Sequence, residues 1–351
     1  TPTGDQQLIV TESPARWREE FPSALVVDPQ LEILPENATY DDIIVNGPSL
    51  ALVQALAPRL NKKGIMFLLG PPRDGGLISL DVGGIHYEDK RFFGGGDTLE
   101  AVAEANRRND LKPGGAALFI GAGGPMGQMH VQRALEKADG PKRVVVTDLD
   151  RGRLNHIVHL FQPIADARGA ELITLASSEF GSPAEMDVQI QELAPNGYDD
   201  IVILAPVAAL VSNSMKFAAP QCFVNVFAGL VVGTKADIPL AALCNGVKII
   251  GSSGSRIKDL ARILELVEGG ELDTNRSVAA IGGLNAARDG LQAVKEARFP
   301  GKTVIYTQIP DLPLMSLKEV SEKLPEIKGK LSPEGAWTKD AEEALLETRL
   351  P

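Results

Sequence analysis

A glycine-rich turn between two regular segments is the part of this sequence best suited to chemistry. The segment Ala117–Ile120 is apolar, the turn from Gly121 to Gly127 follows, and a helix-like segment begins behind it. Glycines at such a turn let backbone amides approach a phosphate, and the amino end of the next helix attracts negative charge. We interpret the stretch as a strand, a phosphate-binding turn and a helix.

An acidic residue lies at a suitable distance from this turn. The segment Arg143–Asp148 has a buried-strand pattern ending in a carboxylate, and 148 minus 127 places Asp148 21 residues after Gly127. A carboxylate there binds the hydroxyl pair of a ribose in dinucleotide-binding folds. The fit is incomplete, since Ala122 holds the place of the first glycine of the usual motif. A tight turn that binds nothing is the alternative.

Length and composition restrict the class of protein. The 351 residues suit two α/β domains, and 23% charged residues with a mean hydropathy near zero are typical of a soluble globular protein. The formal charge of -11 argues against a nucleic-acid partner. The most apolar segments are strand-length, far below the roughly 20 residues of a membrane span, and no secretory signal opens the chain. We expect a cytoplasmic protein.

The cysteines and histidines do not suggest a metal site. Cys222 and Cys244 cannot form a disulfide framework and lack metal-ligand spacing. His156 and His159 have helical i, i+3 spacing, but no acid or thiol nearby completes a ligand set. We interpret this pair as ordinary helix residues and expect no metal ligands in the chain.

Two parts of the chain resemble each other at an offset of 198 minus 40, or 158 residues. Tyr40–Pro48 resembles Tyr198–Pro206, and three further segments follow each in the same order. These pairs are 64–70 with 222–229, 78–80 with 238–240, and 90–96 with 247–253. The order indicates an internal duplication of an α/β unit with parallel strands.

The first copy lacks a glycine turn, although Glu12 could mimic the ribose-binding acid. Its sheet should therefore expose a central edge, unless an N-terminal segment, another segment or another chain fills the gap. The Pro/Gly turn 111–115 marks a boundary between the copies. Helices are expected at 99–110, 257–269 and 284–298.

Several motifs of the second half, taken together, resemble one known family. They are Gly-Pro-Met-Gly127, Val-Val-Thr-Asp-Leu-Asp150, Tyr-Asp-Asp-Ile-Val202, Asn-Val-Phe-Ala-Gly229, Ile-Gly-Gly-Leu284, Gly301-Lys-Thr-Val-Ile-Tyr306, Asp-Leu-Pro-Leu314 and the tail around Trp337. Residues 111–350 are similar to the sorbose-1-phosphate reductase-like branch of the medium-chain, zinc-type alcohol dehydrogenases. The implied fold is α/β, with two Rossmann-like parallel-sheet units in tandem, the first incomplete, and a helical tail. We expect domains at 1–110, 111–310 and 311–351.

The resemblance also implies a nicotinamide cofactor and a set of residues that bind it. The pyrophosphate would lie at the turn and the adenosine ribose at Asp148, while strand ends would line the adenine and nicotinamide sides. Asp148 favours NAD because a carboxylate repels a 2'-phosphate, whereas Arg151 and Arg153 leave NADP as the alternative. The full set of expected cofactor-binding residues is Gly121, Gly124, Pro125, Met126, Gly127, Asp148, Arg153, Ala205, Pro206, Phe227, Ala228, Gly229 and Ser252.

The chain departs from that family where the catalytic zinc domain would stand. The first α/β copy occupies this position, no zinc ligand set is present, and no catalytic residue is assigned. One hypothesis is the cofactor-binding portion of a sugar or polyol (possibly sugar-phosphate) dehydrogenase or reductase whose catalytic domain lies elsewhere. The alternatives are a non-catalytic NAD(H)-binding or subunit-assembly module, and a metal-independent reductase. A homo-oligomer or an absent N-terminal segment is compatible with all three.

The duplication allows one topological prediction. Members of this family pair through the last strand of each sheet, and bare edge strands favour such pairing. We therefore expect Lys90–Phe93 to meet Val247–Ile250, which would form one long sheet within a single chain.

Overall fold

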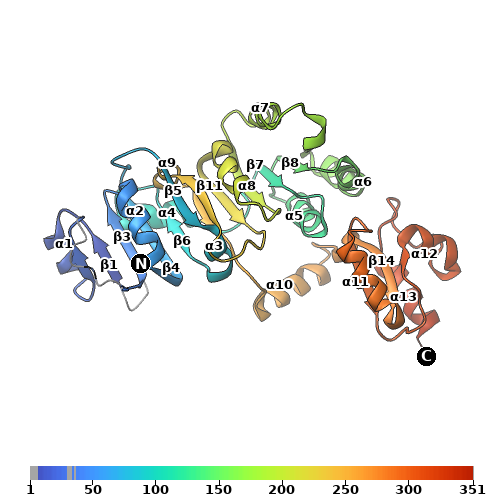
Figure 1. The fold of residues 1–351 in the computed structure, drawn as a ribbon. Helices are drawn as coiled ribbons and strands as arrows, with labels where there is room; N and C mark the ends of the chain where they lie inside the picture. The colour runs from blue at the N-terminus through green and yellow to red at the C-terminus, as the bar shows by residue number, and fades with distance from the viewer. Residues whose placement is uncertain (1–6, 30–33, 35–36, 351) are drawn as a thin grey trace. The chain divides into compact units, whose positions relative to one another are not determined.

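The computed structural model describes residues 7–29, 34 and 37–350 and divides into two compact units (Figure 1). The first unit comprises the described residues of Thr1–Ile120, Pro141–Arg143 and Ser182–Gly254, and the second comprises those of Gly121–Gly140, Val144–Gly181 and Ser255–Pro351. Residues 1–6, which the first expected domain includes, lie outside the described residues. Because the units interleave along the chain, each is described by itself.

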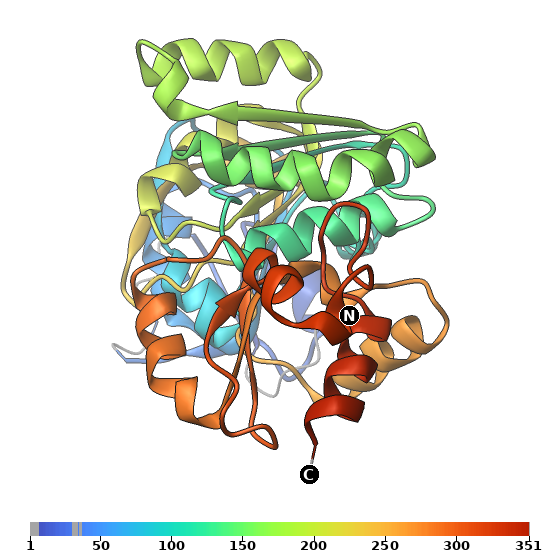
Figure 2. The same cartoon turned by 90° about the vertical axis from the view of Figure 1, so that its right-hand side faces the viewer.

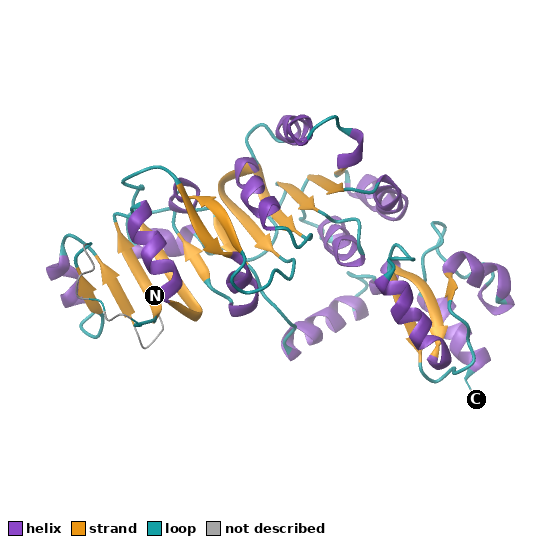
Figure 3. Cartoon of the chain, viewed as in Figure 1, coloured by secondary structure: helices purple, strands orange, loops and turns teal. Residues whose placement is uncertain are grey.

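The first unit is built on a large mixed, mostly parallel sheet (Figure 3). In this unit the strand order is β2-β1-β3-β4-β6-β13-β11-β10-β7, and the only antiparallel neighbours among these described strands are β6 and β13. The strands are β1 (Gln7–Val10), β2 (Leu25–Val27), β3 (Tyr40–Asn46), β4 (Leu60–Leu69), β6 (Arg91–Phe93), β7 (Ala116–Ile120), β10 (Tyr198–Ile203), β11 (Ala218–Val226) and β13 (Lys248–Ile250).

Short capped helices connect these strands. The hydroxyl groups of Ser49 and Thr98 accept hydrogen bonds from the backbone amides of Leu52 and Ala101, which cap the starts of α2 and α4. Leu99–Asp110 was predicted as one helix, but α4 ends at Ala105. The helices of the unit are α1 (Pro14–Glu20), α2 (Leu50–Leu56), α3 (Val82–Glu88), α4 (Leu99–Ala105), α7 (Pro183–Leu193), α8 (Ala208–Ser214) and α9 (Leu240–Cys244).

The two halves of this sheet have matching strand pairings. Parallel neighbours β3, β4 and β6 correspond to parallel neighbours β10, β11 and β13. Strands β6 and β13 then pair antiparallel, with Phe92 opposite Ile249, so the predicted joining of the copies through their last strands is confirmed. A second antiparallel pair, β5 (Leu77–Asp81) with β12 (Lys235–Pro239), sets Ile78 opposite Ile238.

The expectation of an exposed central edge in the first copy is wrong. Strand β1 pairs directly with β3 in parallel, with Leu8 opposite Ile43 and Ile9 opposite Ile44. All four side chains are fully buried. An unpaired buried strand edge is costly because its amides and carbonyls lack partners. The strands on either side of the missing position therefore pair with each other.

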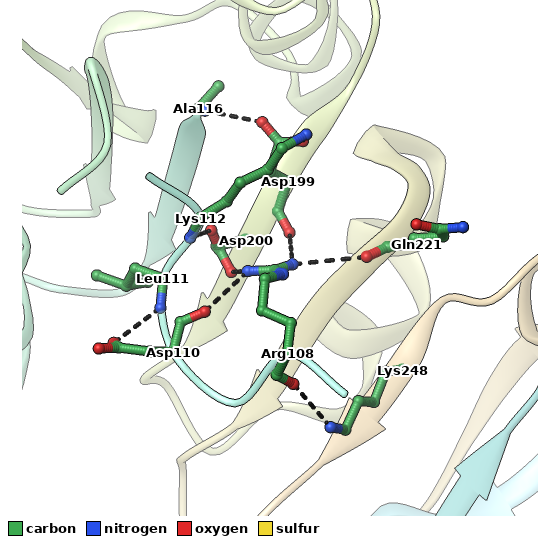
Figure 4. A network of polar contacts seen from close by, with 9 residues as sticks. All are labelled: Arg108, Asp110, Leu111, Lys112, Ala116, Asp199, Asp200, Gln221 and Lys248. Carbon is green, nitrogen blue, oxygen red and sulfur yellow. Dashed lines mark hydrogen bonds and ion pairs between the residues drawn. The ribbon is translucent and has the colours of Figure 1, made fainter. Parts of the chain in front are cut away.

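A polar network fixes the segment that links the two copies to the start of β10 (Figure 4). Arg108 forms an ion pair with Asp200, whose side chain is only 1% exposed, and donates 2.8 Å to the Asp199 carbonyl. The Lys112 amide donates 2.8 Å to the other Asp200 oxygen. Lys248 donates 2.8 and 2.9 Å to the carbonyls of residues 106 and 108. Burial raises the pKa of Asp200 and lowers that of Lys248 to about 8.

The second unit contains the glycine turn and the C-terminal part of the chain. Helices α5 and α6 pack on each other, as Figure 2 shows. The C-terminal strands form a three-stranded sheet, β15-β14-β16, over a core that includes Trp337. The elements are α5 (Pro125–Glu136), β8 (Arg143–Asp148), α6 (Arg151–Arg168), β9 (Glu171–Ala176), α10 (Ile257–Glu268), β14 (Val278–Gly283), α11 (Ala287–Lys295), β15 (Lys302–Tyr306), β16 (Met315–Ser316), α12 (Leu317–Lys323) and α13 (Lys339–Arg349).

Among the residues that the structure describes, no helix combines the length and the apolar character needed to cross a membrane.

Candidate functional site

The glycine turn begins with a tight bend against the end of β8. Gly121 has φ +73°, a conformation that favours glycine. The amides of Gly121 and Ala122 both donate 2.9 Å to the Thr147 carbonyl. Hydrogen bonds therefore join the turn to Thr147, although Gly121 and Thr147 are 26 positions apart in the chain (147 minus 121).

The last glycine of the turn lets α5 approach the backbone. A β-carbon at Gly127 would lie 2.1 Å from the Ala122 carbonyl oxygen and 2.3 Å from its Cα, which no side chain can accommodate. Gln128, fully buried beside it, donates through Nε2 to the Pro300 carbonyl and 3.5 Å to that of Gly123. Gln128 was not among the residues expected from the sequence, where its only signal is a polar side chain at a position facing the core.

Asp148 lies against the turn, as the dinucleotide interpretation requires. Its Oδ2 accepts a 2.7 Å hydrogen bond from the Gly123 amide, and its Oδ1 accepts one of 3.1 Å from Asp150. A β-carbon at Gly123 would lie 2.6 Å from the Asp148 Cγ, so only glycine permits this contact. The carboxylate remains half-buried, which leaves part of it open to a ligand.

The amino end of α5 offers main-chain donors beside that carboxylate. Gly124 is the N-cap of this 12-residue helix and no side chain caps it. A β-carbon at Gly124 would have no atom within 4 Å. Pro125 begins the helix and Met126 is 44% exposed. Uncapped amides, open space and the positive end of the helix dipole fit a pyrophosphate.

The two arginines after Asp148 have different neighbours. Arg151 donates 2.6 Å from Nε to Glu179 and 2.9 Å from Nη1 to the Thr174 hydroxyl. The Glu179 hydrogen bond raises the pKa of Arg151. Arg153 packs close to Gly123, since a β-carbon on that glycine would lie 2.9 Å from the Arg153 Cβ. Arg153 rather than Arg151 is thus placed near the turn.

The remaining expected cofactor residues belong to the first unit. The Leu204 amide donates 2.8 Å to Ile120, and those of Phe227 and Ala228 donate 3.1 and 2.9 Å to Ile203. The ends of β7, β10 and β11 therefore lie on one edge of the sheet, where open parallel sheets bind ligands. Ala205 and Phe227 are half-buried there and Ala228 is buried, whereas Pro206, Gly229 and Ser252 are exposed.

The residues present do not fit a zinc site. Among the described residues, no group of three histidine, cysteine or acidic side chains could hold a metal ion. Cys222 and Cys244 are buried, and burial raises the pKa of both thiols, that of Cys244 to about 12. His159 instead hydrogen-bonds the Glu334 carbonyl at 2.7 Å from α6. The zinc chemistry expected from the resemblance therefore has no ligands in this part of the chain.

Comparison with known proteins gives the context for this site. No family model matches the chain. Mannitol-1-phosphate 5-dehydrogenase of Aliivibrio fischeri is 30% identical over 250 residues, covering 68% of this chain and 57% of that protein. L-sorbose 1-phosphate reductase of Klebsiella pneumoniae is 28% identical over 244 residues, covering 67% and 56%.

A solved structure was also found. The crystal structure of an NAD-dependent alcohol dehydrogenase is 25% identical and aligns over 56% of this chain and 52% of that protein, with a TM-score of 0.43. The chain spans just over half the length of the relatives that it matches. By sequence, over about two thirds of its length, the chain is a distant homologue of the two sugar-phosphate enzymes.

Proposed function

We propose that this chain is the nicotinamide-dinucleotide-binding portion of a sugar or polyol dehydrogenase or reductase, with a sugar phosphate as the favoured substrate class. The contact that carries the proposal is the 2.7 Å hydrogen bond from the Gly123 amide to Asp148. It holds a carboxylate beside an uncapped helix end, so one ligand with a diphosphate and a ribose can use both. The names of the relatives supply the substrate class.

Each residue type has a defined role in this proposal. The amides from Gly124 to Gly127, with Gly121 shaping the bend, bind the pyrophosphate, and Asp148 binds the adenosine ribose. Ala205, Pro206, Phe227, Ala228, Gly229 and Ser252 serve the rest of the cofactor from the strand ends. NAD is favoured over NADP because the Asp148 carboxylate would repel a 2'-phosphate. NADP is the alternative, since Arg153 lies close to the turn and could pair with that phosphate. When bound, the cofactor supplies the hydride that a carbonyl reduction requires.

We further propose that the fold consists of two Rossmann-like copies, residues 1–110 and 111–310, followed by a tail at 311–351. The first copy is not proposed to bind a dinucleotide. Arg73 pairs with Glu12, the counterpart of the ribose-binding acid. Moreover, β1 and β3 close the position at which a phosphate turn would stand.

Calorimetry with NADH tests the function. The unsubstituted chain should bind NADH, and Gly127→Glu should remove binding because its side chain would collide with Ala122. Gly75→Glu is the control, since a β-carbon at Gly75 meets no atom within 4 Å and its backbone is not in the left-handed region that favours glycine. Equal NADH affinity in the chain and the Gly127→Glu variant would contradict the proposal.

A non-catalytic NAD(H)-binding or assembly module is the second candidate. It is favoured by the lack of a metal-ligand group among the described residues. NADH binding without reduction of any sugar phosphate, even with a separately supplied catalytic domain of a relative, would support this second function.

A further inference from the structure

Helix α3 of the first copy lies across strand ends of the second copy, within the first unit. It packs against β11 and β13. The Nδ1 of His86, a residue only 7% exposed, lies 3.0 Å from the Val226 carbonyl oxygen, so this nitrogen carries the donated proton. A β-carbon at Gly251 would lie 2.7 Å from the His86 Cα. His86 therefore anchors α3 at the carboxyl ends of β11 and β13.

The next residue brings a hydroxyl group to the same edge. The Tyr87 ring packs edge-on against His86, with centroids 4.5 Å apart at 88°. A β-carbon at Gly229 would lie 2.7 Å from the Tyr87 hydroxyl oxygen, so the phenol lies directly beside Gly229. Tyr87 is 50% exposed, and no hydrogen bond between described residues uses its hydroxyl. A ligand at this strand end would therefore meet a free donor.

The duplicated fold contains an internal comparison for this feature. The contact of α3 with Gly251 has a counterpart in which α9 of the second copy touches Gly94 of the first. A β-carbon at Gly94 would lie 2.1 Å from the Leu243 carbonyl oxygen, and the Gly95 amide donates 2.9 Å to Cys244. By these contacts Cys244 corresponds to His86 and Asn245 to Tyr87, and Cys244 is buried whereas Asn245 is exposed.

The backbone contacts are thus alike on the two sides, but the side chains are not. A buried histidine and a half-exposed tyrosine occur only where the helix faces the copy that has a glycine turn. The phenol therefore stands at the strand ends of the copy whose glycine turn is proposed to bind the cofactor, and the equivalent position on the other side carries Asn245.

We propose that the Tyr87 hydroxyl donates a hydrogen bond to the carboxamide oxygen of the cofactor's nicotinamide ring, beside Gly229. This inference rests on the proposed function. Tyr87 would touch the ligand, whereas His86 would position it by holding α3 on Val226. The first copy, which lacks its own phosphate turn, would then contribute a binding residue to the site of the second copy.

Two ligands separate this role from a general effect on the fold. NADH contains the nicotinamide ring with its carboxamide, whereas ADP-ribose has the same adenosine, diphosphate and second ribose but lacks that ring. Tyr87→Phe should weaken NADH binding about two- to ten-fold, the usual effect of one lost hydrogen bond. It should leave ADP-ribose affinity unchanged. Tyr40→Phe is the matched control, because the buried Tyr40 hydroxyl has no partner among the described residues. Tyr40 is the first residue of β3 and so lies away from the carboxyl ends of the strands, where the ligand is proposed to bind.

The outcomes distinguish the two proposals. Unchanged NADH affinity in Tyr87→Phe would overturn the role of Tyr87 while leaving the proposed function intact. An equal loss for NADH and ADP-ribose would show a structural effect and would also overturn it. If the unsubstituted chain bound neither ligand, both the proposed function and this inference would fail.

Discussion

Phe92 and Ile249 lie opposite each other where β6 and β13 pair antiparallel, and both are buried. Truncating either side chain removes packing at the junction. Ile249→Ala should lower the free energy of unfolding by about 2–5 kcal/mol, as buried truncations do. Ile257→Ala, at a residue 87% exposed, should change it by less than about 0.5 kcal/mol. Urea denaturation measures both.

The pairing itself is tested by a double-mutant cycle. Phe92→Ala and Ile249→Ala should show a coupling energy of about 0.5 kcal/mol or more because the residues are cross-strand neighbours. Strictly additive effects would show that the two side chains do not contact each other in solution.

Asp148→Asn tests the choice of cofactor. The asparagine oxygen can still accept a hydrogen bond from the Gly123 amide. The negative charge that we propose binds the ribose hydroxyls and repels a 2'-phosphate is lost. NADH affinity should fall about ten-fold, and the affinity for NADPH relative to NADH should rise. Asp150→Asn makes the same charge change while preserving the helix cap. Both variants having the same NADPH to NADH ratio would argue against a ribose contact by Asp148.

Arg108→Met should destabilise the chain strongly. It leaves Asp200 as a carboxylate that is 1% exposed without its cationic partner, which typically costs about 3–5 kcal/mol. The neighbouring Arg107 provides the control, since its side chain is 79% exposed and its ion pair with Glu104 lies on the surface. Arg107→Met should cost less than about 1 kcal/mol. Comparable losses on thermal unfolding would contradict the importance of the network in Figure 4.

The Lys248 ammonium gives stability a specific pH dependence. Burial, followed by the charges of Arg91 and Arg108, lowers its pKa to about 8 from the ordinary value of 10.5. Between these two pH values the unfolded chain binds a proton that the folded chain has released. The contribution of this group to the free energy of unfolding therefore rises with pH. Its contribution cannot exceed about 1.4 kcal/mol per pH unit. Relative to Lys248→Met, the chain should therefore gain stability from pH 8 to 10 in urea titrations. A constant difference between the two would contradict the lowered pKa.

The sequence determined the local features of this protein. Helix α10 (Ile257–Glu268) begins and ends close to the expected residues because capping and glycine signals act within a few residues. The requirement for glycine at Gly127 is also local, since α5 packs there against Ala122, only five residues earlier in the chain (127 minus 122). The joining of the copies was predicted from the resemblance to a family whose members pair through their last strands, applied to the two duplicated segments.

Only the tertiary structure decided which distant residues complete each region. The closure of β1 on β3 depends on a competition between strand edges that no local pattern records. Gln128 meets Pro300 across 172 residues, and His86 meets Val226 across 140. Such contacts form where the packing of apolar surfaces places particular polar atoms side by side. For that reason the place of Tyr87 beside Gly229 could not be read from the spacing of residues along the chain.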